Sequence, residues 1–186
     1  MSLDILTNQL EGALESEFYF LALATALSVP DFAAAIDSDN GKATGAKYKT
    51  WYDKWVRPRF SINVNQIFET RGITQTIELE NPFDGAECYY YRCAMLHQAR
   101  STHDKSAFSR VMFIEPKSTS SIVHYGILND ALTIDLPSFC LEVVQGYRDW
   151  VTFARVTENY ERNIANTMQR YSNGLKPYIG GVPVIS

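Results

Sequence analysis

Apolar residues recur at helical spacing along most of this chain, and no other feature of the sequence restricts the fold as strongly. In the first segment they return every three or four positions, as Leu3, Leu6, Leu10, Leu14, Phe18 and Leu21. This periodicity predicts a long helix over about residues 3–28, closed by Pro30, with a short helical turn over 31–37. A second helix is predicted over Lys42–Val56, because its aromatic residues fall on one face and its lysines outside it.

A third helix is the most informative segment of the sequence. Asp84 stands where an N-cap residue belongs, and Glu87, three positions later, completes a capping-box pattern. The helix predicted from Gly85 to about Gln98 carries apolar residues on nearly every side. A helix of this kind is expected in the middle of a fold.

The regions before and after this third helix carry weaker patterns. Residues 57–83 have no clear period and are predicted to be irregular, apart from a short helical piece near Val64–Thr70. Phe108–Ile114 and Ile122–Leu128 alternate apolar and polar residues around a turn-rich stretch. The alternation predicts a small β-hairpin near 108–128, to which Leu132–Ile134 adds a third short strand.

The last third of the chain is predicted to be a long helix and a tail. Pro137 fits the first turn of a helix that reaches about Tyr171, and Gly146 marks a kink or a close helix contact inside it. The tail, residues 175–186, is rich in glycine and proline and is predicted to be extended. With no repeat or linker in view, residues 1–186 are expected to form a single mostly α-helical domain, a helical bundle with long first and last helices.

Composition excludes several classes of protein. A content of 46% hydrophobic residues suffices for a packed core and excludes a disordered chain. The longest apolar stretch, Phe18–Leu27, is about half of the roughly 20 residues that a bilayer span needs, and no basic segment precedes it. We therefore expect no membrane segment and a cytoplasmic location. The odd number of cysteines (Cys88, Cys93 and Cys140) favours reduced thiols there.

Charge is distributed unevenly along a chain whose net charge is −4. Residues 1–41 hold seven acids and no base, whereas residues 42–59 hold six bases and one acid. A net acidic chain is a poor default binder of nucleic acid, but a local basic stripe can still contact phosphates. Lys47, Lys49 and Lys54 are therefore candidates to guide an RNA backbone. In the alternative interpretation, the stripe is a solvated helix face paired with the acidic first helix.

Within the third helix lie an arginine and a histidine, Arg92 and His97. A guanidinium keeps its charge when buried, so Arg92 must find an anion or another acceptor. Histidine exchanges protons near neutral pH. Metal-free RNA cleavage uses this combination: a cation to stabilise the phosphate and an imidazole to move the proton of the ribose 2′-OH.

The spacing Arg92-x4-His97 resembles the R-x(4–6)-H motif of the HEPN superfamily, small all-helical domains found in many prokaryotic toxins and defence ribonucleases. The resemblance extends to the motif helix and the helical layout, and leaves out the hairpin. It implies a homodimer whose two motifs face each other across a cleft and cut RNA without a metal or other cofactor. It also implies RNA as the substrate and an antitoxin protein as a possible partner. By resemblance, Arg92 and His97 are the catalytic residues.

Two features depart from the family pattern. Cys93 occupies the position after the arginine, where active members commonly carry a polar residue. A spacing of five residues also turns about 140° on a regular helix, so the two side chains project apart unless the helix frays or a partner subunit completes the site. To the pair we add Glu17, an acid predicted on the inner face of the first helix, as the residue that orients one of them.

Other functions stay open at this stage. In a non-catalytic binding or scaffold module, for example one encoded by a mobile element, Arg92 would hold Glu17 or Glu87 in a core ion pair and His97 would cap carbonyls. Binding of nucleotides or nucleic acid without cleavage would fit Cys93. A metal site is disfavoured because the cysteines and histidines offer no second closely spaced ligand pair.

Overall fold

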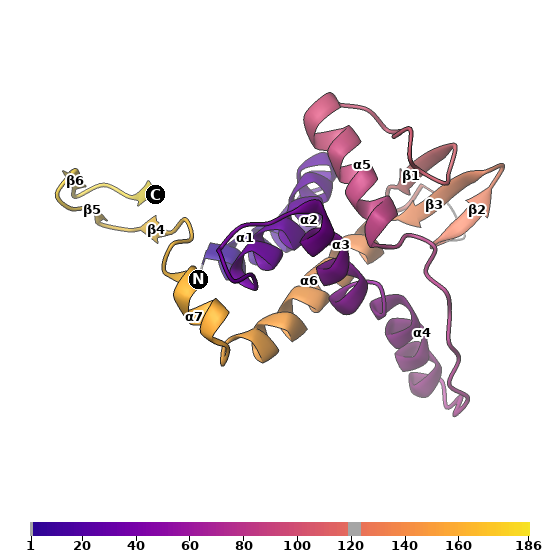
Figure 1. Cartoon of the computed structure of the whole chain (residues 1–186). Coiled ribbons are helices and arrows are strands. Elements are labelled where there is room, and N and C mark those ends of the chain that lie inside the picture. Colours follow the sequence, from indigo (N-terminus) through magenta and orange to yellow (C-terminus); the bar gives the residue numbers. More distant parts are fainter. Residues whose placement is uncertain (1, 119–123) are drawn as a thin grey trace.

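The computed structural model describes residues 2–118 and 124–186, and within them the protein is mostly α-helical (Figure 1). The helices are α1 (Ser2–Glu15), α2 (Tyr19–Ile36), α3 (Gly45–Trp55), α4 (Arg59–Thr70), α5 (Gly85–Gln98), α6 (Leu136–Ala154) and α7 (Glu158–Ile164). A small sheet is formed by β1 (Arg110–Ile114), β2 (Gly126–Leu128) and β3 (Ala131–Asp135). Four two-residue strands, β4 (Arg170–Tyr171), β5 (Gly174–Leu175), β6 (Ile179–Gly180) and β7 (Val184–Ile185), lie in the tail.

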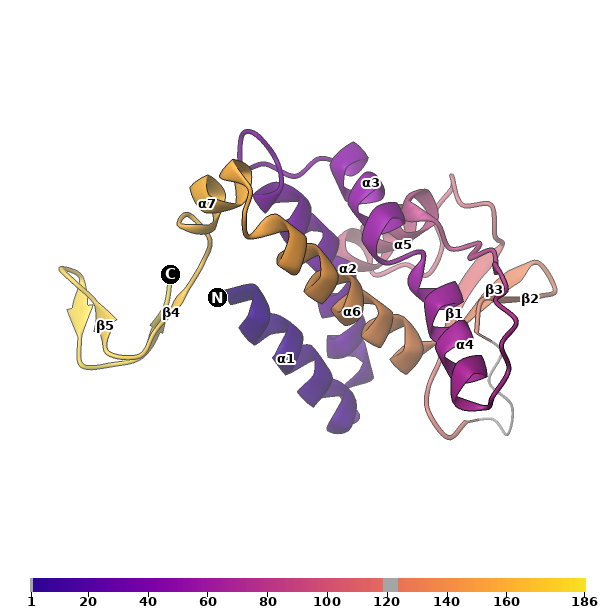
Figure 2. The same cartoon turned by 90° about the horizontal axis from the view of Figure 1, so that it is seen from below.

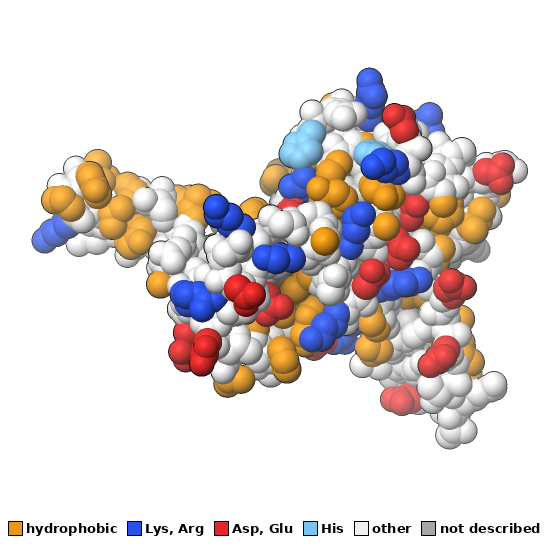
Figure 3. Space-filling view, viewed as in Figure 1, with side chains coloured by type: hydrophobic (Ala, Val, Ile, Leu, Met, Phe, Trp, Pro, Cys, Tyr) orange, Lys and Arg blue, Asp and Glu red, His pale blue; other side chains and the backbone are white. Residues whose placement is uncertain are grey.

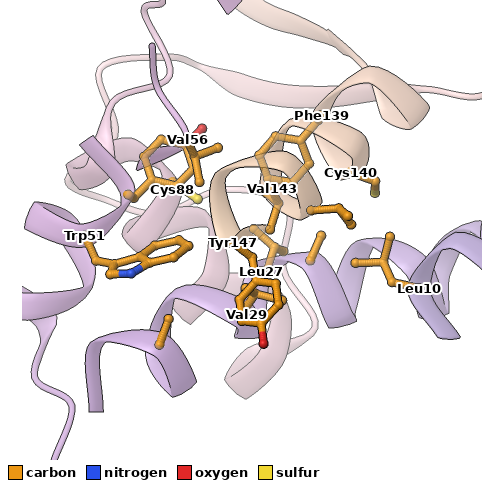
Figure 4. Packing of buried hydrophobic residues seen from close by; sticks show 14 of the residues in the cluster. Leu10, Leu27, Val29, Trp51, Val56, Cys88, Phe139, Cys140, Val143 and Tyr147 are labelled. Carbon is orange, nitrogen blue, oxygen red and sulfur yellow. The ribbon is translucent and has the colours of Figure 1, made fainter. Parts of the chain in front are cut away.

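Helices α2 and α6 form the centre of the fold. Figure 2 shows α1, α2 and α6 lying side by side, and α2 also packs against α3, α5 and α7. The packed side chains between them are shared by all these helices (Figure 4), with Leu10, Leu27, Trp51, Val143 and Tyr147 among them. Gly146 permits a close approach of α6 to the end of α3: a Cβ at this position would lie 2.5 Å from the carbonyl oxygen of Trp55. The sequence expectation of a close helix contact at Gly146 is confirmed.

Helix α2 is long and apolar enough to cross a bilayer by length and composition. Half of its 18 residues are nevertheless buried inside the protein, against helices on several sides. Apolar character all round a helix is also typical of the central helix of a packed domain. In this structure α2 is a central helix packed against its neighbours.

The first helix predicted from the sequence is two helices. The break falls at Ser16–Phe18, where Glu17 adopts a positive φ of 61° and the amide of Phe18 donates to the carbonyl of Ala13. Pro30 lies buried inside α2 rather than closing it. The leucine period continues through the break, so periodicity alone could not locate it, and burial of α2 outweighs the hydrogen bond that Pro30 cannot make.

The β-hairpin predicted near 108–128 is wrong in its pairing. Strand β3 is central, β1 pairs with it in parallel, and β2 pairs with it antiparallel, so the hairpin joins β2 to β3. All five residues of β3 are buried, which explains why both neighbours pair with it rather than with each other. Part of the predicted second strand, residues 122 and 123, lies outside the described residues.

Two further helix predictions need correction. The helical piece predicted near Val64–Thr70 is confirmed but is longer, since α4 begins at Arg59. Residues 71–83 have no helix or strand, as predicted, and side chains of α4 bind this segment along the helix. Ser61 Oγ donates to the carbonyl of Leu79 and accepts from its amide, and Asn65 does the same with Ile77. The predicted long last helix ends at Ala154, and Thr157 caps a separate α7 by accepting from the amide of Tyr160.

Candidate functional site

Helix α5 is held in place at its N-terminal end. Asp84 accepts from the amides of Ala86 and Glu87 as the predicted N-cap, and the amide of Gly85 donates to Asp53 on α3. A Cβ at Gly85 would collide with the backbone of Lys49, so α3 and α5 meet closely here. The carboxylate of Glu87 does not close a capping box. It accepts from Ser106 Oγ and the amide of Ala107 at 2.6 and 2.8 Å instead.

The position of α5 differs from the expectation that it lies in the middle of the fold. Within α5 only Gly85, Glu87, Cys88 and Ala94 are buried, and its last turn is exposed. Its tyrosines are partly buried and cover neighbouring side chains with their rings. His97, in the last turn of α5, therefore lies at the surface, whereas Arg92 is partly buried.

Arg92 and His97 lie in direct contact. Arg92 Nη1 is 2.7 Å from His97 Nε2, and Arg92 Nη2 is 2.7 Å from a carboxylate oxygen of Asp31 on α2. The side chains of Arg92 and Asp31 are 19% and 18% exposed, whereas His97 is exposed. The prediction that the two side chains project apart is wrong. The helix does not fray, but the arginine side chain is long enough to reach His97 around the helix.

The tautomer of His97 decides whether its contact with Arg92 is a hydrogen bond. A guanidinium only donates hydrogen bonds, so His97 Nε2 must accept, and the neutral ring then carries its proton on Nδ1. An accepting Nε2 has a lone pair available to a proton of a substrate hydroxyl once the ring turns from Arg92.

Burial and charge act in opposite directions on the ion pair. Burial raises the pKa of the Asp31 carboxyl, and the positive charge of Arg92 only partly offsets this effect. Burial lowers the pKa of the Arg92 guanidinium, but Asp31 and the Cys93 thiol outweigh it and the pKa lies above its ordinary value. Arg92 Nε makes no hydrogen bond within the described part of the chain. Asp31 therefore orients the guanidinium, and because Nε is buried, only the outer Nη donors of Arg92 are open to an anion.

Asp31 is the site residue that sequence reasoning missed, and Glu17 is the one it placed wrongly. Glu17 lies at the start of α2, about 20 Å along the helix from Asp31, and its side chain is 64% exposed. Its carboxylate accepts from Lys117 Nζ at 3.3 Å. The break between α1 and α2 turns Glu17 outward, away from the inner face expected for it, and so removes it from the pair it was predicted to orient.

Replacing Glu17 with glycine should raise stability, because a non-glycine residue at a φ of 61° is strained and glycine is not. We expect a gain of about 0.5–1 kcal/mol in the free energy of unfolding, since the exposed pair with Lys117 contributes little. Urea titration of both proteins measures it. A Glu17→Gly protein less stable than the parent would show that the carboxylate has a structural role.

The three lysines do not form one stripe. Lys49 Nζ lies over the rings of Tyr90 and Tyr89 on α5, at 4.7 and 5.3 Å from their centroids. Lys54 Nζ lies over the rings of Trp55 and Phe153, the latter on α6. Lys47 Nζ donates to Asn40 Oδ1 and the carbonyl of Lys42. Lys49 alone of the three is seen against the helix that carries Arg92 and His97.

The alternative interpretation of the basic run does not match the structure either. In the described chain, Arg57 and Arg59 pair with Asp53 and Asp149, and neither aspartate belongs to the acidic first segment. Acids of α1 instead face the last long helix, where Glu11 accepts from Arg148 at 2.7 Å. Charge balance along the sequence gave no information on which helices are neighbours in space.

The cysteines behave as core residues except for Cys93. Burial raises the pKa of the Cys140 thiol to about 12 and that of Cys88 further. Cys93 is partly exposed and its Sγ lies 3.8 Å from Arg92 Nη1. Over residues 2–118 and 124–186, no three His, Cys, Asp or Glu side chains converge as metal ligands.

Comparison with protein-family models, with curated proteins and with solved structures finds no match to this chain. Asp31, Arg92 and His97 are therefore the residues from which a function is inferred.

Proposed function

We propose that the protein is a metal-independent endoribonuclease of HEPN-like type, acting in the cytoplasm as a toxin or in phage defence. The observation that carries the proposal is the 2.7 Å contact of Arg92 with His97, together with Asp31 behind the arginine. A cation held by a buried acid and a neutral imidazole at the surface are the two groups that transesterification of RNA needs.

In the proposed reaction, a phosphodiester oxygen binds the outer donors of Arg92. His97 Nε2 takes the proton of the ribose 2′-OH as the 2′-oxygen forms a bond to phosphorus. The bond from phosphorus to the 5′-oxygen breaks, and the leaving oxygen receives a proton from an imidazolium. Charge that builds on the phosphoryl oxygens is stabilised by Arg92, whose position Asp31 maintains. The products are a 2′,3′-cyclic phosphate and a 5′-hydroxyl.

The assembly is part of the same proposal. Two copies that face each other through α5 would supply one imidazole as base and the other as acid, as the family resemblance implies. Lys49, beside Tyr89 and Tyr90, is the lysine placed to contact an RNA backbone near this helix. An antitoxin would be a protein that covers this face.

The ion pair itself favours a second candidate, a non-catalytic binding or scaffold module. Arg92 joins α5 to α2 through Asp31, which is a structural role in its own right. A loss of stability in Arg92→Ala is consequently expected under both functions and does not separate them. His97 does, because it is exposed and contributes little to packing.

Purified protein should cut single-stranded RNA in the presence of EDTA. A 5′-labelled oligoribonucleotide tests this, with the 3′ ends analysed for a cyclic phosphate by mass spectrometry. Cleavage that requires Mg²⁺ and leaves 5′-phosphates would contradict the proposal. RNA binding without any cleavage would favour the binding module.

A further inference from the structure

The tail beyond α7 is a folded arm rather than a loose extended end. We define the arm as Met168–Ser186. β4 pairs with β7 and β5 with β6, and Gln169 and Ser186 exchange two backbone hydrogen bonds. Gly174 has a φ of 86°, and a Cβ there would collide with the backbone of Ile179, so the tight turn requires glycine. The sequence thus specifies the shape of the arm.

The arm projects from the helices and exposes apolar side chains. In Figures 1 and 2 it extends away from the body, and Figure 3 shows hydrophobic side chains gathered on it. The exposed apolar residues are Met168, Tyr178, Ile179, Val182 and Ile185, and Tyr178 is 84% exposed. Across the described chain, the hydrogen bonds of the arm lie within it. A small hairpin of this kind is marginally stable alone and gains from a partner surface.

The body carries an apolar groove beside the base of the arm. Its volume is about 570 Å³, and it is walled by α1, the end of α2 and the arm base. The apolar residues lining it from the body are Leu3, Ile5, Leu6, Phe32, Ala35 and Ile36. Ile5 and Phe32 are 41% and 46% exposed, so the groove presents open apolar surface.

Charge on the arm complements charge around the groove. The arm holds Arg170 and Lys176 and no acid. Most acids of residues 1–41 are engaged elsewhere, Glu11 with Arg148, Asp31 with Arg92 and Glu17 with Lys117. Asp37 and Asp39 are exposed just before Asn40 and Lys42, which line the groove. Lys176, near the tip of the arm, and the carboxylates of Asp37 and Asp39 at the edge of the groove are complementary charges on two apolar surfaces.

We propose that the arm binds in the groove of a second copy of this chain, in a reciprocal exchange. The groove of the same copy does not suit the arm tip, because Met168 and Ile185 at the arm base are themselves part of its wall. The tip at Tyr178 extends from that wall away from the body. In a dimer with twofold symmetry, the arm of each copy can reach the groove of the other copy. Both arms and both grooves then belong to one interface. This assembly does not depend on the nuclease proposal.

The mass of the full chain in solution tests the exchange. Light scattering after size exclusion should give twice 21.1 kDa, or a larger multiple where the α5 faces of the proposed nuclease pair as well. Ile5→Asp in the groove, and Tyr178→Ser with Ile179→Ser in the arm, should each raise the dimer dissociation constant by at least 100-fold. Ile127→Ser on β2, also at an exposed apolar position, is the matched control and should leave the mass unchanged. A monomeric parent chain, or a parent mass that both variants leave unchanged, would overturn the proposal.

Cross-linking identifies which groove the arm occupies. In a Cys93→Ser background, Ile5→Cys and Ile179→Cys proteins are mixed and treated with a short bis-maleimide. Because Cys88 and Cys140 are buried, the introduced thiols are the reactive ones. We expect a covalent dimer of the two different variants. A double variant, Ile5→Cys with Ile179→Cys, that cross-links only within one chain would overturn exchange and show that the arm closes on its own groove. Light scattering and cross-linking do not involve RNA, so their outcomes are separate from that of the cleavage assay.

Discussion

Replacing His97 with alanine should lower the rate of RNA cleavage by at least about 100-fold, because the variant lacks the group that takes the 2′-OH proton. The melting temperature should change little, since His97 is exposed and surface substitutions usually alter the free energy of unfolding by about 0.5 kcal/mol or less. Arg92 stays held by Asp31 in this variant. Single-turnover cleavage of a labelled oligoribonucleotide in EDTA, with thermal unfolding of the same samples, measures both effects.

His103→Ala is the matched control for the loss of an imidazole. His103 stacks on Tyr90 with ring centroids 4.9 Å apart, so it lies beside α5 without contacting Arg92 in the described structure. We expect its cleavage rate to stay within about threefold of the parent rate, well below the effect of losing a general base. Equal activity of His97→Ala and the parent would remove His97 from the mechanism. An equal loss in both variants would point to a general effect on α5.

Elements with local signals were predictable from the sequence. Asp84 as an N-cap located the start of α5, and the aromatic face of Tyr48, Trp51 and Tyr52 located α3, because caps and helical periods depend on residues a few positions apart. The pair of Arg92 and His97 was singled out by residue type and spacing, whereas the helical period wrongly predicted that the two side chains project apart. What periodicity could not supply was the break at Glu17, where the apolar pattern continues but the backbone turns.

Elements fixed by distant contacts were not predictable. Parallel pairing of β1 with β3 depends on burial of β3 on both faces. A strand buried on both faces has no alternation of apolar and polar residues by which the sequence could predict it. Asp31 was overlooked because the sequence argument ended the first helix at Pro30. Once Pro30 lies inside α2, Asp31 occupies its last turns and reaches Arg92, 61 positions away in the chain.

Replacing Arg92 with alanine should lower the free energy of unfolding at neutral pH by about 2 kcal/mol, because it leaves the Asp31 carboxylate without its partner in a mostly buried position. For a chain of this size the melting temperature should fall by about 4–8 °C. Cleavage should also be lost, since the cation that stabilises the phosphate is gone. Urea titrations at several pH values, beside the RNA assay, measure the two losses.

The pH dependence identifies Asp31 as the source of the instability. Its pKa in the folded protein is raised by burial, so the folded state holds this proton more tightly than the unfolded state, whose value is about 3.9. The stability gained from this tighter proton binding is fully present below the pKa that Asp31 has in the unfolded chain. It is lost as the pH rises through the pKa that Asp31 has in the folded protein. Without Arg92 the pKa of Asp31 in the folded protein rises further, so the stability deficit of Arg92→Ala should be largest at neutral pH and shrink toward about pH 4.

Adding Asp31→Asn to Arg92→Ala should restore most of the stability at neutral pH but none of the cleavage. A deficit that is the same at all pH values, or that Asp31→Asn does not repair, would mean that Arg92 stabilises the fold through packing of its aliphatic stem rather than through the ion pair.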